Sequence, residues 1–337
     1  MKKSGLLVTL FLIAMMCKAQ DAQFSQFYAA PLNINPAYAG NTDNATLYLN
    51  ERMQWPSSNM RSHLSSVSLD FISVIPHAGF GLILQNSFDV STKQQSNMLG
   101  ICYSYNIVLH KRFSIRPGLQ TTLLNRVLGN DLLFGDQYDS YGRLVNTSSV
   151  DNTSKKMIFA PDISAGLMAF SRQDFWIGVA AHHLNRPNIS FYSVSKSRLP
   201  VLWSVNGGYN FGLSNKYKSG GLRVNSADYS SAMTPVFSYR LQDGFEMLDL
   251  GLYYFTYPVC VAFWYRGIPI KKYQDVRTNQ AFVVLAGLKF ARLKIAYSYD
   301  INLSKLKGTG GAHELSIAYS FSSSYHNNRG YVPSPSW

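Results

Sequence analysis

The sequence predicts an all-β protein, a transmembrane outer-membrane β-barrel of about 14 antiparallel strands with an ordered N-terminal arm. Apolar and polar residues alternate through most of the chain, as in Glu314–Phe321, where Leu315, Ile317 and Tyr319 face away from Glu314, Ser316 and Ala318. Charged residues make up only 15% of the 337 residues, whereas Tyr (22) and Phe (20) are abundant. Low charge with many aromatic residues is typical of a wall that faces lipid.

Residues 1–19 are expected to form a secretory signal peptide. Lys2 and Lys3 give the positive start, Leu6 to Met16 the apolar run, and Cys17-Lys18-Ala19 a small-x-small cleavage site. A lipoprotein signal that uses Cys17 is the alternative, but Met16 stands where a small residue is expected. The chain is therefore expected to be exported.

Composition argues against two other classes of protein. Only the first segment is a continuous apolar run, which excludes a helical membrane protein. The formal net charge is +13, yet export and the lack of a basic helix or a zinc-ligand spacing argue against nucleic acid as a partner. Basic side chains in loops and lumen instead suit acidic lipid headgroups or an acidic partner.

Residues 20–44 are expected to form the arm, on the periplasmic side or in the lumen. The segment does not alternate, contains Pro31 and Pro36, and is too aromatic for a disordered tail. Two interpretations stay open: an arm packed on or inside the barrel, or a docking surface for a periplasmic partner.

Residues 45–321 are expected to form the barrel. Alternation predicts strands at about 45–55, 62–72, 78–88, 97–108, 112–125, 159–170, 174–184, 200–213, 232–242, 246–255, 258–267, 280–290, 291–301 and 312–321.

The lengths of the connections favour a membrane barrel over a β-sandwich, which would show the same alternation. Long connections fall on one side, at 126–158, 185–199, 268–279 and 302–311, and short ones on the other, at 109–111, 171–173 and 256–257. Long outer loops and short periplasmic turns are the habit of outer-membrane barrels. The gap at 214–231 is an exception. An even number of strands leaves the tail, residues 322–337, in the periplasm.

The predicted lumen carries charges of both signs. Alternation directs inward Arg116, Arg240, Arg266, Lys289 and Lys294, and likewise Asp70, Asp249 and Asp300. Such a wall either forms a salt-bridged, partly plugged interior or lines a pore with slight anion preference.

No residues predict catalysis, a metal or a cofactor. Cys102 and Cys260 fall on opposite sides of the barrel and are expected to stay unpaired. His182 and His183, as neighbours on a strand, are expected to point to opposite faces, so they cannot readily bind one metal ion. Serines are plentiful, but no G-x-S-x-G elbow of a hydrolase occurs.

Three stretches together resemble the PorP/SprF family, outer-membrane barrel proteins of the Bacteroidetes type IX secretion system: QFSQFYAAPLNINPAYAG (Gln23 to Gly40), WYRGIP (Trp264 to Pro269) and GAHELSIAYSF (Gly311 to Phe321). The resemblance implies a non-enzymatic protein of the outer membrane that assists secretion or surface anchoring of a cargo protein with a type IX C-terminal domain. It also implies contact with periplasmic components of the machinery. A passive channel for small solutes is the alternative function.

The same stretches supply the residues predicted to bind partners. Asn35, Pro36, Tyr38 and Gly40 are expected at the periplasmic opening; Trp264, Tyr265, Arg266, Gly267 and Pro269 are expected where a strand leaves the membrane outward. We hypothesise that the outer rim and loops grip the cargo, while the arm plugs the barrel or meets the machinery.

Overall fold

The computed structural model describes residues 21–42, 44–73, 75–109, 113–129, 137–139, 143–146, 155–171, 175–192, 196–213, 231–268, 272–273, 276–277, 281–303 and 308–321. The signal peptide and the tail predicted at the two ends lie outside these ranges. Within them, no helix is long and apolar enough to cross a membrane.

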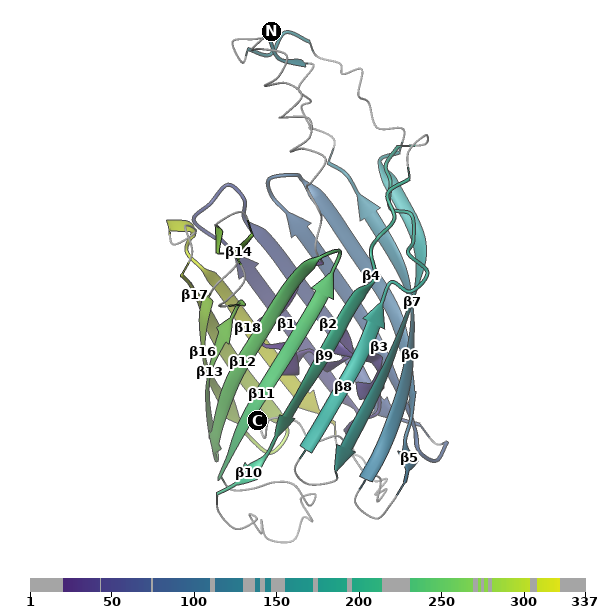
Figure 1. Ribbon diagram of the computed structural model, residues 1–337, viewed down its shortest axis with the longest axis vertical. Helices are drawn as coiled ribbons and strands as arrows, with labels where there is room; N and C mark the ends of the chain where they lie inside the picture. The colour runs from purple at the N-terminus through teal and green to yellow at the C-terminus, as the bar shows by residue number, and fades with distance from the viewer. Residues whose placement is uncertain are drawn as a thin grey trace.

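The chain forms a closed barrel of 14 antiparallel strands (Figure 1), which confirms the predicted fold class. The strands are β1 (Thr46–Gln54), β2 (Ser62–Ile72), β3 (Ala78–Asp89), β4 (Gln94–Tyr105), β6 (Phe113–Val127), β7 (Met157–Ser171), β8 (Phe175–His182), β9 (Leu202–Tyr209), β11 (Ser231–Gln242), β12 (Phe245–Thr256), β13 (Val259–Arg266), β16 (Ala281–Lys289), β17 (Leu293–Asn302) and β18 (Ala312–Ser320). β18 pairs with β1 from Thr46↔Ser320 to Gln54↔Ala312, and this pairing closes the wall.

Four short strands complete the sheet structure. β5 (Ile107–Val108) continues β4 along β6, and β10 (Phe211–Gly212) continues β9 along β11. β14 (Lys272–Tyr273) and β15 (Val276–Arg277) pair with each other outside the barrel wall. The predicted strands agree with the observed ones to within a few residues. Between β4 and β5, the Asn106 N–H donates to His77 O over 2.8 Å.

Alternation produces the two faces of the wall. On β4, Leu99, Ile101 and Tyr103 are exposed on the outside, whereas Cys102 and Ser104 are buried inside. An apolar outer face is what a strand needs where no water is present to hydrate polar side chains. The outer face therefore contacts lipid, and the polar face encloses the lumen.

The two ends of the barrel differ in their connections. At one end lie Thr46, Ser320 and the short links 257–258 and 290–292, which identifies the periplasmic end. At the other, outer end lie the long links 128–156 and 183–201, although β11 and β12 are joined there by the short turn Asp243-Gly244.

The N-terminal arm packs inside the barrel. Its helical turns are η1 (Phe27–Ala29), α2 (Pro31–Ile34) and η2 (Pro36–Tyr38), and the last two begin with a proline. Figure 1 shows this purple segment enclosed by the strands. Its apolar side chains share one core with inner-face residues of the wall, so the arm fills the lumen.

Candidate functional site

The arm spans the lumen from the outer end toward the periplasmic end. At its start, the Asp21 N–H donates to Gln242 Oε1 over 3.1 Å, at the outer end of β11. At its finish, the N–H groups of Gly40 and Asn41 donate to the Asp70 carboxylate, near the periplasmic end of β2. The arm thus descends inside the barrel before the chain turns back up into β1.

Near its outer end the arm is held by two wall carboxylates. The Ser25 and Gln26 N–H groups donate to Glu314 Oε2 and Oε1 over 2.6 and 2.8 Å. Ser25 Oγ donates to Asp300 Oδ2 over 2.6 Å. Hydrogen bonds to a charged acceptor are the stronger kind, each contributing about 1.5–3 kcal/mol.

Two arginines neutralise these carboxylates. Arg52 lies 2.9 Å from Asp300 and 3.2 Å from Glu314, and Arg266 lies 2.8 Å from Asp249. Arg266 Nη1 also donates to Ser25 Oγ over 2.9 Å, and Arg52 Nη1 donates to the same oxygen. All are buried, and buried charges persist only when they are paired and hydrogen-bonded. We call Ser25 and Gln26 with Glu314, Asp300, Arg52 and Arg266 the outer anchor.

A histidine between two carboxylates holds the first residue of the arm. His183 Nδ1 and Nε2 each lie 2.9 Å from a carboxylate oxygen, of Asp162 on β7 and of Asp21 respectively. Burial by itself would lower the pKa of His183, but the bonds and charges of the two carboxylates outweigh it and raise the pKa to about 9. Burial would likewise raise the pKa of Asp21, and His183 instead holds it below the usual value of 3.8. The imidazolium therefore bridges arm and wall.

The expectation that His182 and His183 point to opposite faces is wrong. β8 ends at His182, and His183 adopts a positive φ of 61°, which ends the alternation and turns its ring inward. His182 Nε2 lies 3.1 Å from Ile34 O of the arm, and the two ring centres are 6.4 Å apart. Both histidines thus hold the arm.

In the middle of the lumen the arm lies on wall glycines. A Cβ added at Gly118 on β6 would lie 2.3 Å from Ala37 N, and one at Gly166 on β7 would lie 1.9 Å from Asn35 Oδ1. Asn35 uses the space: its Oδ1 accepts from Ala37 N over 2.8 Å and its Nδ2 donates to Val179 O over 3.0 Å. We call Gly118 and Gly166 the glycine patch.

Aromatic side chains fix the arm against the neighbouring wall, from β8 to β12. Tyr28 donates to Gly207 O over 2.9 Å and meets Trp176 and Tyr253 edge-on, with ring centres 5.7 and 6.2 Å apart. Tyr253 in turn stacks on Trp264 at 5.8 Å. Such pairs contribute about 0.5–1.5 kcal/mol each beyond the apolar area they bury.

The arm residues predicted to bind a partner lie inside the lumen. Asn35, Pro36 and Tyr38 are buried against the wall, and Tyr38 Oη accepts from Asn206 Nδ2 over 3.0 Å. Gly40, half-buried with φ 66°, packs backbone to backbone against Gly79 at the periplasmic side. Binding of a periplasmic partner by these residues stays a prediction.

The second predicted group lies along β13. Trp264 and Arg266 point inward and are buried, whereas Tyr265 is half-buried on the outer face beside Phe282. Gly267, with φ 132°, ends the strand, and Pro269 lies outside the described residues. Through Arg266 this group meets the arm at Ser25, near the outer end of the lumen, rather than at the predicted arm residues Asn35 to Gly40.

The remaining sequence expectations concern the lumen wall. Arg116, Arg240 and Arg266 are buried inside, and the Lys289 ammonium lies 5.1 Å from the centre of the Phe255 ring. Lys294 lines a cavity of about 50 Å³ beside Tyr28 and Tyr38. Cys102 on β4 and Cys260 on β13 are free and buried, and their strands lie across the barrel from each other.

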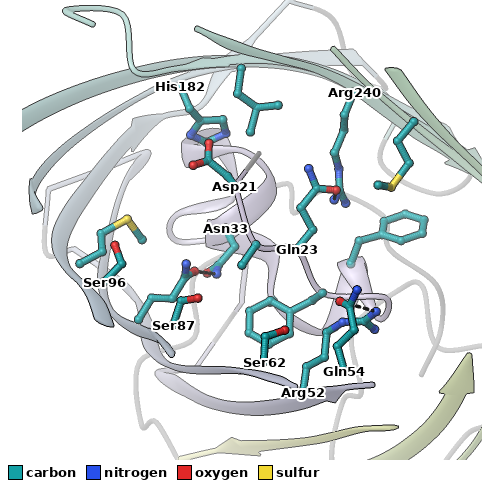
Figure 2. Close-up of a pocket in the computed structure, with 18 of the residues that line it drawn as sticks. Asp21, Gln23, Asn33, Arg52, Gln54, Ser62, Ser87, Ser96, His182 and Arg240 are labelled. Carbon is teal, nitrogen blue, oxygen red and sulfur yellow. Dashed lines mark hydrogen bonds between the residues drawn. The ribbon is translucent and has the colours of Figure 1, made fainter. Parts of the chain in front are cut away.

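Above the arm, a cavity of about 560 Å³ reaches the outer ends of the strands. Its floor is the arm, which contributes Phe24 and, as Figure 2 shows, Gln23 and Asn33. Its wall includes Ser62 at the start of β2 and Asp89 at the end of β3. We call this space the outer cavity.

Sequence reasoning missed Glu314, Arg52, Asp162 and the glycine patch as parts of the site. Glu314 and the two glycines were detectable as unusual residues on inward positions of clear strands. The residues that they contact were not detectable, because those residues lie in the arm, which has no periodicity.

Comparison with known proteins identifies the family. The sequence model of the type IX secretion system membrane protein PorP/SprF matches residues 16–319. No curated protein matches the chain. Similar solved structures include the CymD monoaromatic hydrocarbon channel, 12% identical over 88% of this chain and 94% of that one with a TM-score of 0.48, and a Pseudomonas aeruginosa FadL homologue, 12% identical over 86% and 93% with a TM-score of 0.43. At these identities the likeness says nothing about function. The family match and the barrel place the protein in the outer membrane, and the chain belongs to the PorP/SprF family of type IX secretion system membrane proteins.

Proposed function

We propose that this protein is a plugged outer-membrane barrel that assists secretion or cell-surface anchoring of a cargo protein with a type IX C-terminal domain. Membership of the PorP/SprF family supports a role in this secretion system. The observation that carries the proposal is the arm, which fills the lumen from Asp21 at the outer end to Asn41 near the periplasmic end. A lumen so filled serves a binding role better than it serves conduction.

The outer end is the side that we propose for the cargo. Most of the long connections lie there, together with the outer cavity and Gly267 at the end of β13. The periplasmic end, with Gly40 and the short turns, is the side available to periplasmic components of the machinery. We assign the protein no catalytic step.

Recovery of the protein from outer membranes tests this function. Tagged protein is purified in mild detergent and its companions are identified by mass spectrometry; a secreted protein with a C-terminal sorting domain is expected. A variant that lacks residues 131–153 in the longest outer connection should retain less of that companion. Recovery of a barrel without any companion, together with steady single-channel conductance in planar bilayers, would favour the passive channel instead.

A further inference from the structure

The two sides of the outer cavity carry different kinds of side chain. On the side of β1 to β4 most of the lining is uncharged, at the inner positions Gln54, Ser62, Gln85, Ser87 and Ser96, and its charged members are Arg52 and Asp89. Across the cavity from Ser62, Figure 2 shows Asp21 of the arm, His182 and Arg240. The two sides therefore offer different chemistry to anything that enters from outside.

Most charged groups around the cavity already have partners. Arg52 and Arg266 contact Asp300, and His183 contacts both Asp21 and Asp162. Arg240 donates to Gln23 and lies in the field of Asp249 and Glu314. A ligand with its own net charge would have to compete with these partners, so the cavity does not select one.

The uncharged side presents hydrogen-bonding groups that are free. The hydroxyls of Ser62, Ser87 and Ser96 make no hydrogen bond within the described part of the chain, and all three residues are half-buried. Gln54 Oε1 accepts from Arg52, and since arginine only donates, the Gln54 amide nitrogen must face elsewhere. Gln85 Oε1 accepts from Asn33 over 2.5 Å, which leaves the Gln85 amide nitrogen free in the same way.

The wall shows how it holds a peptide, because it already holds one. Ser104 Oγ donates to Ala39 O over 2.6 Å, Asn35 Nδ2 of the arm donates to Val179 O, and His182 lies against Ile34 O. Hydroxyl, amide and imidazole side chains thus meet main-chain carbonyls throughout the filled part of the lumen. The free serines and glutamines continue the same kind of surface above the arm.

From these observations we infer that the outer cavity is a binding site for an extended, uncharged polar peptide segment of the secreted partner, which lies along β1 to β4 on top of the arm. Main-chain carbonyls of that segment accept from the Gln54 and Gln85 amides, and its N–H groups donate to the serine hydroxyls. The inference rests on the proposed function, because the secreted partner is the cargo named there.

Filling the cavity tests the inference. Ser87→Leu and Ser96→Leu place an apolar side chain among the free polar groups, and Gln95→Leu, the exposed outward neighbour of Ser96, is the matched control. We expect about a tenfold loss of partner recovered from outer membranes for the first two, equivalent to about 1.4 kcal/mol, and wild-type recovery for Gln95→Leu. Equal recovery from all three would overturn the site while leaving the anchoring function in place. If the wild type recovers no partner, it is the anchoring function that fails.

Cross-linking identifies the chemistry of the occupant. Ser96→Cys labelled with benzophenone maleimide, compared with Gln95→Cys, should attach to one partner segment rich in Ser, Thr, Asn or Gly. Attachment to an acidic segment, or equal attachment from both positions, would contradict the inference. So would binding of neutral hexasaccharides to purified protein that Ser96→Leu abolishes, since sugar would then be the ligand.

Discussion

The outer anchor and the glycine patch hold the same arm by opposite means. At the anchor, the wall supplies charge: Glu314 and Asp300 accept from Ser25 and Gln26. At the patch, the wall supplies no charge, and Gly118 and Gly166 let the backbone at Ala37 and the Asn35 side chain approach where any Cβ would collide. The first depends on ionisation, and the second depends on shape and on neutral hydrogen bonds.

A side chain in the glycine patch should have the largest effect. In Gly118→Leu the new Cβ would lie 2.3 Å from Ala37 N, below the 3.0 Å that real Cβ atoms keep. Because the obstacle is backbone, the arm must leave its place, and we expect steady conductance in planar bilayers where the wild type shows little.

Gly308→Leu is the control, since nothing lies within 4 Å of the added Cβ. Heat-dependent migration on gels verifies that each barrel has formed. A closed Gly118→Leu barrel as stable as the wild type would show that shape does not hold the arm.

Loss of charge at the outer anchor should have the next largest effect. Glu314→Gln keeps the size of the side chain but leaves Arg52 with one carboxylate, and breaking a buried pair costs about 3–5 kcal/mol. We expect a lower midpoint of thermal unfolding and faster hydrogen exchange at the Ser25 and Gln26 amides. Glu51→Gln, at a side chain 49% exposed on the outer face, should change the midpoint little. Equal effects of the two substitutions would mean that the outer anchor contributes no more to stability than an exposed carboxylate.

A change of pH should have a smaller effect, confined to the start of the arm. The pKa of His183 is about 9 in the folded protein against 6.5 for the free side chain, so its stabilising charge is complete below about pH 6.5 and lost as pH rises through 9. Asp21, whose pKa is lowered, acts in the reverse sense and loses its contribution only in acid. Limited proteolysis near Asp21 should therefore accelerate between pH 6.5 and 9.

His183→Gln tests the cause of that acceleration, because glutamine keeps a hydrogen bond but does not titrate. Its proteolysis rate should be flat over the same interval. The glycine patch should not respond to pH, and the protection factor of the Ala37 amide, which removes the intrinsic pH dependence of exchange, provides the comparison. A wild-type slope that survives in His183→Gln would assign the titration to another group.

How far the sequence predicts this molecule depends on periodicity. Every strand of the barrel wall was predictable because alternation is local, and β2 was predicted to the residue, whereas β14 and β15 lie in what was predicted as a connection. The arm was recognisable from Pro31, Pro36 and its aromatic residues. Its path through the lumen was not, because a segment without periodicity does not indicate which strands it will contact. His183 was misassigned because a single positive φ ended the alternation that the prediction extended. Glu314 was placed correctly on the inner face, yet its partners stand almost at the other end of the chain.

The bond from Ser25 to Glu314 joins residues 289 positions apart. The Glu314 carboxylate reaches its position only when β18, the last strand, has paired with β1. The arm is made first, but it can be seated only when the wall is complete. Binding of the arm in the lumen therefore reports that the barrel is complete. An incompletely inserted barrel leaves the aromatic and amide side chains of Phe24 to Tyr38 exposed, where quality-control proteases can reach them.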